Sequence, residues 1–154
     1  MFCVEMLKYL CDLSIVNWGV VLVRRDVFDW FEEAREELET AEQLFRLGRY
    51  AHSCFHSQQA AEKALKALII HLKRVVHRSH DLVELYEEVR GELALGDVVE
   101  RRLPELSAYY TQSRYPNAGL RRPSAEIGEE QAERCLEASR GVLSAVAGKI
   151  GAKI

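Results

Sequence analysis

The segment around Arg114 carries residue types that can bind a phosphate and a nucleobase together. An arginine guanidinium can bind phosphate oxygens while a neighbouring aromatic ring stacks on a base. The alternative is an Arg114 that pairs with a carboxylate such as Glu62, with the tyrosines as half-buried packing residues. The basic and aromatic residues of this segment are Tyr109, Tyr110, Arg114, Tyr115, Arg121 and Arg122.

A polar strip within residues 50–74 supplies a second set of candidate ligand-binding groups. Its members recur at steps of three and four, so a helix places them on one face. Lys63 and Lys66 could bind phosphate groups there. The alternative is a solvated face on which Glu62 and Lys66 form a weak ion pair. The strip consists of His52, His56, Gln59, Lys63 and Lys66.

The spacing of histidines and cysteines predicts no metal site. His52 and His56 lie four residues apart, but no third ligand shares their strip. The chain has four cysteines and no CxxC pair, and Cys54 and Cys135 fall on apolar stripes where they are expected to be core residues. We therefore expect no metal, no cofactor and a reduced protein of the cytoplasm.

Residues 73–81, KRVVHRSHD, combine a basic run with a helix-capping signal. Asp81 can accept backbone N–H groups at the start of a helix. The cations could touch a phosphate backbone, or they could stabilise the negative end of the preceding helix. Gln58 is expected on an apolar face, where its buried amide needs hydrogen-bond partners that tie helices together.

Helical periodicity and helix-end residues predict an all-α fold, an antiparallel up-and-down bundle of four to five helices over residues 25–150. Residues 50–74 form its centre, because they contain neither Gly nor Pro and are apolar over most of the helix circumference. A stripe of small residues there would let a neighbouring helix come close. The stripe is Ser57, Ala60, Ala64 and Ala67.

The other predicted helices span about residues 26–47, 81–90, 98–113 and 128–147, and residues 114–124 form a loop. We expect Asp26 to cap the first of them. Pro104 predicts that the fourth helix starts at Leu103 or kinks there. Gly148 and Gly151 are expected to end the last helix. The expected buried stripe of residues 26–47 is Trp30, Ala34, Leu38, Ala41 and Phe45.

Length and composition fit one globular domain with a substantial core. The chain has 154 residues, of which 48% are apolar, and a net charge of −3, so no overall basic field indicates nucleic-acid binding. Residues 1–24 form an extension of uncertain structure, which could also stem from an early start codon. Charges interrupt its apolar residues, and it lacks a basic start and a cleavage site, so we expect neither a membrane span nor a signal peptide.

Three segments together resemble the HEPN family of small helical domains of bacteria and archaea. They are FHSQQAAEKALKALI, then HRSHDL, then SRYPNA. The resemblance covers about residues 25–146. It implies a homodimeric helical bundle that binds nucleotides or RNA and is often paired with a small nucleotidyltransferase in a toxin–antitoxin-like module. Lys63 and Lys66 match the lysines of the family's central motif.

The resemblance also implies what is missing for catalysis. Catalytic HEPN ribonucleases carry an Arg and, four to six residues later, a His that assists attack of the RNA 2′-hydroxyl. Arg114 stands at the matching place, but the next ten residues, YPNAGLRRPS, contain no His. We therefore expect a non-catalytic binding and interaction domain. The alternative is a metal-independent ribonuclease toxin that uses Arg114 with a His from elsewhere, such as His56 or His80.

Overall fold

The computed structural model describes residues 25–153, and the predicted extension 1–24 lies outside the described residues. Every regular element within 25–153 is a helix, which confirms the all-α prediction. The chain is helical over 25–46, here called the first helix. The later helices are α2 (Tyr50–Lys73), α3 (Leu82–Glu87), α4 (Asp97–Gln112), α5 (Pro123–Glu126) and α6 (Glu129–Ile150).

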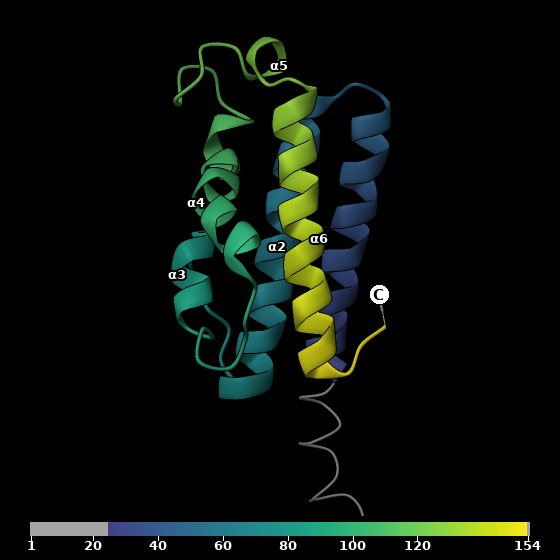
Figure 1. The fold of residues 1–154 in the computed structure, drawn as a ribbon, viewed down its shortest axis with the longest axis vertical. Coiled ribbons are helices and arrows are strands. Elements are labelled where there is room, and N and C mark those ends of the chain that lie inside the picture. Colours follow the sequence, from purple (N-terminus) through teal and green to yellow (C-terminus); the bar gives the residue numbers. More distant parts are fainter. Residues whose placement is uncertain (1–24, 154) are drawn as a thin grey trace, which may run out of the picture.

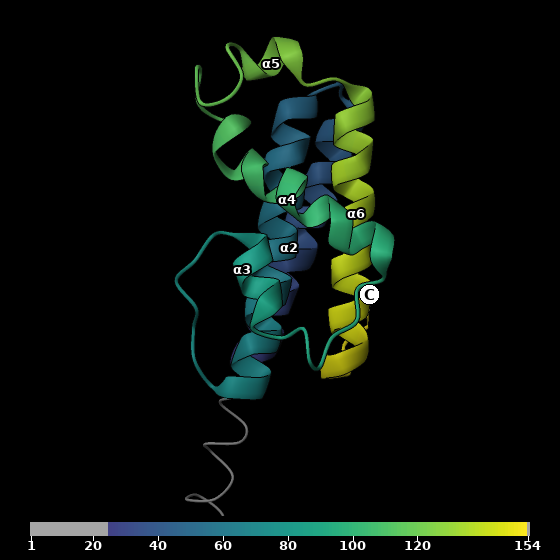
Figure 2. The same cartoon turned by 60° about the vertical axis from the view of Figure 1, so that its left-hand side comes forward.

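The first helix, α2 and α6 run side by side along the long axis of the molecule (Figure 1). The helices α3 and α4 pack on the remaining side of α2, and α4 crosses the long helices obliquely (Figure 2). The short α5 lies over the end of the bundle where α4 finishes and α6 begins (Figure 1). The helix α2 contacts all the later helices, so it is the central helix that the sequence predicted.

The small-residue stripe of α2 lies inside the bundle. Ser57, Ala60, Ala64 and Ala67 are all fully buried, and among the helices α2 to α6 the most extensive contact is that between α2 and α6. Small side chains at these positions shorten the distance between helix axes. Leu72 is an exception to the apolar face that residues 50–74 are expected to bury, because its side chain is 40% exposed near the end of α2.

The first helix turns a slightly different face inward than predicted. Val27 and Phe31 are its fully buried large residues, whereas Trp30, Leu38 and Phe45 are only partly buried. The two candidate faces differ by one residue, about 100° of rotation, and both are apolar enough to satisfy the pattern. Asp26 does not cap this helix, since residues 25 and 26 are already helical.

Two helix boundaries differ from the prediction. The helix α4 begins at Asp97 and continues through Pro104, so the prediction of a start at Leu103 is wrong. The last helix passes Gly148 and ends at Gly151, whose φ of 72° is the left-handed conformation typical of a glycine after a helix. Pro123 opens α5 inside the predicted loop, at a helix position where its missing N–H costs nothing.

The two cysteines within the described residues are core residues, as predicted. Cys54 and Cys135 are buried and free, and a hydrogen bond with Cys54, together with burial, raises the pKa of the Cys135 thiol. No helix within residues 25–153 is long and apolar enough to cross a membrane.

Candidate functional site

Three aromatic rings surround the guanidinium of Arg114. Its Cζ lies 4.5 Å from the ring centroid of Tyr110, 4.7 Å from that of Phe55 and 5.0 Å from that of Tyr115. Its Nε donates a 2.8 Å hydrogen bond to the carbonyl oxygen of Tyr110, one helical turn earlier. Cation–π contacts and this bond hold the side chain in one place at the end of α4. We call Phe55, Tyr110, Arg114 and Tyr115 the arginine cluster.

Arg114 is exposed and has no ion-pair partner within the described residues. The alternative of an Arg114–Glu62 pair is therefore wrong. The two terminal nitrogens of the guanidinium make no hydrogen bond to residues 25–153, and its charge is not neutralised by a carboxylate there. A guanidinium in this state is suited to binding an anion from outside the chain.

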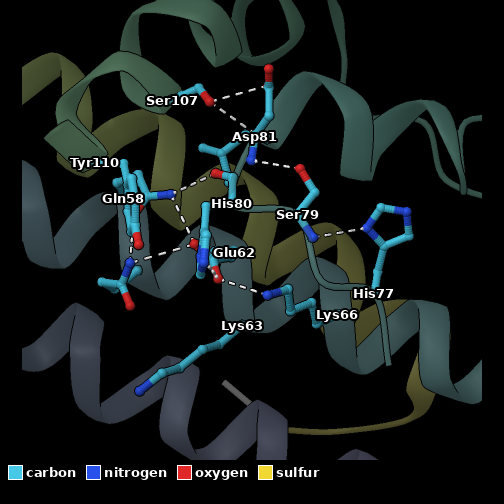
Figure 3. A network of polar contacts seen from close by, with 12 residues as sticks. Gln58, Glu62, Lys63, Lys66, His77, Ser79, His80, Asp81, Ser107 and Tyr110 are labelled. Atoms are coloured by element: carbon cyan, nitrogen blue, oxygen red, sulfur yellow. Dashed lines mark hydrogen bonds and ion pairs between the residues drawn. The ribbon is translucent and has the colours of Figure 1, made fainter. Parts of the chain in front are cut away.

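Glu62 instead organises a buried polar network on α2 (Figure 3). Its carboxylate accepts hydrogen bonds from the side chains of Gln58 at 3.1 Å, Gln59 at 3.4 Å and Lys66 at 2.9 Å, and it contacts His80 Nδ1 at 2.9 Å. Glu62 and Lys66 are only 4% and 5% exposed. The prediction of a solvated face is therefore wrong for Lys66, although its pairing with Glu62 is confirmed. Burial of both charges requires this many partners.

His80 connects this network to the arginine cluster. Its ring stacks on Tyr110 with centroids 4.5 Å apart and planes 9° apart, while its Nδ1 contacts Glu62. Gln58 Nε2 donates a 3.1 Å bond to the His80 carbonyl oxygen and so ties α2 to the segment before α3, as predicted. Arg114 lies over the same Tyr110 ring, so His80 and Arg114 both contact one aromatic side chain.

Asp81 caps α3, as the sequence predicted. Its Oδ1 accepts a 2.8 Å bond from the backbone N–H of Val83 and a 3.2 Å bond from Ser107 Oγ of α4. Ser107 Oγ in turn accepts a 3.0 Å hydrogen bond from the backbone N–H of Leu82. The cap therefore fixes the His80–Asp81 segment between α2 and α4.

His56 and Lys63 both contact Glu37 of the first helix, and the His56 ring also lies edge-to-face with Phe55 of the arginine cluster, with centroids 5.2 Å apart. Lys63 Nζ donates a 2.7 Å bond to Glu37 Oε1, and His56 Nδ1 lies 2.6 Å from Glu37 Oε2. In Figure 3 the Lys63 side chain points away from Glu62, whereas Lys66 points toward it. Burial acts to raise the pKa of Glu37, but the bonds and charges of His56 and Lys63 outweigh it and lower that pKa.

The remaining predicted residues take separate positions. Arg121 is exposed in the loop before α5. Gln59 Nε2 bonds to Gln58 Oε1 at 2.7 Å as well as to Glu62. His52 is exposed, and the part of the chain that the structure describes has no group of three His, Cys, Asp or Glu side chains that could hold a metal.

Sequence reasoning missed two residues of the site. Phe55 belongs to the apolar face of residues 50–74, which predicts a buried core side chain, but it is only partly buried and its ring lies against Arg114. Glu62 was considered only as a surface partner for Lys66 or Arg114. Its position four residues after Gln58 and four before Lys66 was the available signal, because this spacing places all three side chains together on a helix.

Comparisons with known proteins agree with this fold. The family model described as HEPN domain matches residues 27–150. A protein of Methanocaldococcus jannaschii named "Putative toxin MJ1304" is 31% identical over 127 residues, which are 76% of this chain and 83% of that protein.

Two solved structures are also similar. The crystal structure of TT1696 from Thermus thermophilus has a TM-score of 0.73 and 31% identity, over 80% of this chain and 97% of that one. The crystal structure of ST0689, described as an archaeal HEPN homologue, has a TM-score of 0.65, with the same identity and the same coverage of both chains.

Proposed function

The chain belongs to the HEPN domain family, and we propose that it is a non-catalytic domain that binds a nucleotide or RNA through Arg114. In this proposal the guanidinium binds a phosphate group, and the exposed ring of Tyr115 offers a surface for a base. Such a combination of a cation and an aromatic ring suits single-stranded nucleic acid.

One observation supports this proposal above the others: a charged side chain is held in place by three rings and has no carboxylate partner within residues 25–153. Arg134, by contrast, pairs with Glu105 at 2.9 Å, so a carboxylate already neutralises its charge. The rings of the arginine cluster fix the side chain and leave its charge available, so less side-chain entropy is lost when an anion binds.

We further propose that the protein acts as a homodimer in the cytoplasm, within a toxin–antitoxin-like module, beside a small nucleotidyltransferase. The resemblance to a protein named as a toxin supports the module. Sedimentation at micromolar concentration should give about twice the 17.6 kDa of one chain, and a monomer would contradict the dimer. Co-purification with a nucleotidyltransferase encoded by a neighbouring gene tests the partner.

The binding proposal is tested with a labelled single-stranded RNA and fluorescence anisotropy. Arg114→Gln removes the charge and should weaken binding at least about tenfold, because a hydrogen bond to a charged group contributes about 1.5–3 kcal/mol. Arg121→Gln is the matched control, since it removes the same charge from the same loop but from a side chain without a ring contact. Equal losses in both variants would indicate a non-specific electrostatic effect.

A second candidate function is cleavage of RNA, and the position of His80 favours it. His80 and Arg114 both pack on Tyr110, and the Glu62 carboxylate orients the His80 ring through Nδ1. His80 could accept the proton of a 2′-hydroxyl while Arg114 stabilises the charge that develops on the phosphate. No metal is needed for this chemistry.

Incubation of RNA with the pure protein tests this second candidate. Cleavage should leave 2′,3′-cyclic phosphate ends, and His80→Gln should abolish it without abolishing binding. Absence of cleavage by the wild-type protein, in the presence of measurable binding, would remove the enzyme candidate and leave the binding proposal in place.

A further inference from the structure

A groove between residues 80–83 and α4 adjoins the arginine cluster. Its volume is about 410 Å³, and Tyr110 belongs both to its lining and to the arginine cluster. We call it the α3–α4 groove. On the α4 side its lining recurs at steps of three and four: Pro104, Ser107, Ala108 and Thr111. Arg114 is the next residue in this series, three after Thr111, so one face of α4 leads from the groove to the guanidinium.

The charges of the groove and of the arginine cluster differ in sign. Asp81 is the carboxylate among the residues that line the groove, and these residues include no Arg or Lys. A phosphate in the groove would meet the negative charge of Asp81, whereas at Arg114 it would meet a positive one. A nucleotide that uses both features must therefore place its phosphate at Arg114 and its uncharged nucleoside in the groove.

Two polar groups of the groove, on Asp81 and Thr111, are able to bind a hydroxyl group. Oδ1 of Asp81 already accepts two hydrogen bonds, from Val83 and Ser107, but Oδ2 has no partner within residues 25–153. The Thr111 hydroxyl is likewise without a partner there and is exposed. A carboxylate oxygen can only accept a hydrogen bond, so it favours a hydroxyl donor over the hydrogen of a deoxyribose.

We propose that the α3–α4 groove is a ribonucleoside subsite, in which Asp81 and Thr111 bind the 2′-hydroxyl of a nucleotide whose phosphate lies on Arg114. Pro104 and Ala108 provide the apolar surface for the base or the sugar. This inference rests on the proposed function, and it names the substrate class: ribonucleotides and RNA are bound, and DNA of the same sequence is discriminated against.

The test compares a labelled decamer of uridine with the matching decamer of deoxyuridine. The wild-type protein should bind the ribose form about tenfold more tightly, which corresponds to one charge-assisted hydrogen bond. Asp81→Asn keeps a residue that caps helices well, and it should reduce this ratio to less than about threefold. Thr111→Val removes an exposed hydroxyl at nearly constant shape and should reduce the ratio as well.

Arg114→Gln is the control that separates the two proposals, because it should weaken both decamers by the same factor and leave the ratio unchanged. Circular dichroism and the thermal midpoint show whether each variant is folded. If Asp81→Asn is not folded, the ratio for Thr111→Val alone decides the test. Equal binding of both decamers with dependence on Arg114 would overturn the groove inference and leave the binding proposal standing. Absence of binding to either decamer would overturn both.

Discussion

Glu62 and Arg114 carry opposite charges, and the protein surrounds them with different kinds of contact. Glu62 is buried and receives contacts from four side chains, whereas Arg114 is exposed and is held by aromatic rings. A buried charge must be compensated inside the fold, and Glu62 is. The charge of Arg114 is not compensated within the described residues, so Glu62 supports the structure, whereas the guanidinium of Arg114 is available for the ligand that we propose.

The Glu62 network gives a stability prediction. Glu62→Gln leaves the ammonium of Lys66, only 5% exposed, without its carboxylate, and should lower the free energy of unfolding by about 3 kcal/mol. Adding Lys66→Met should restore part of the loss, because no buried charge then lacks a partner. Urea denaturation of the two single variants and the double variant measures the coupling. Losses that simply add would show that the two charges are not coupled.

At the scale of elements, α2 organises the molecule through its small residues and its polar face. The small stripe is fully buried, Gln58 and Glu62 fix the segment before α3, and Glu37 of the first helix bonds to Lys63 of α2. The close contact of α4 with α6 depends on a glycine as well. A Cβ on Gly141 would lie 2.6 Å from Val99 Cγ2.

Two glycines of α6 form a matched pair of tests. A Cβ on Gly148 would have no other atom within 4 Å, so Gly148→Ala should raise the free energy of unfolding by about 0.5–1 kcal/mol through helix propensity. Gly141→Ala has the same propensity gain but clashes with Val99, so it should be at least about 1 kcal/mol less stable than Gly148→Ala. Thermal or urea unfolding measures the free energy of unfolding of both variants. Equal free energies would mean that α4 can shift away from residue 141 without a loss of stability.

The contact between the first helix and α2 should respond to acid. The pKa of Glu37 is lowered in the folded protein from an ordinary value of 4.5, so its contribution to stability is present above that value. This contribution is lost as the pH falls through the lowered pKa. Glu37→Gln should therefore be less stable than wild type at pH 7, and the difference should shrink toward pH 3. A constant difference over that range would exclude the proposed linkage.

The features that could be predicted from the sequence are those that depend on local contacts. The span of α2, the Asp81 cap and the buried Gln58 were predictable, because each depends on residues a few positions apart. The inward face of the first helix was not, since Trp30 and Phe31 are adjacent and equally apolar. The meeting of His80 and Arg114 on Tyr110 depends on how α4 crosses α2, which no local pattern encodes.

At the scale of the whole molecule, a chain with a net charge of −3 presents its candidate anion site at one end of the bundle. The first helix carries many of the acidic residues, including Glu32, Glu33, Glu36 and Glu39, whereas Arg114, Arg121 and Arg122 lie at or near the loop before α5. Glu126, Glu129 and Glu130 lie at the same end, in α5 and at the start of α6, so Arg114 is a local positive site in surroundings of mixed charge. Binding should therefore depend on salt through the few phosphate contacts that are made.

The salt dependence of RNA binding shows whether Arg114 contacts a phosphate. Each phosphate contact on a single strand contributes a slope of about −0.7 in a plot of log K against log salt concentration. The slope for Arg114→Gln should be shallower than that of wild type by about 0.7, and the slope for Arg121→Gln should be closer to wild type. An unchanged slope in Arg114→Gln, with the fold intact, would contradict this contact.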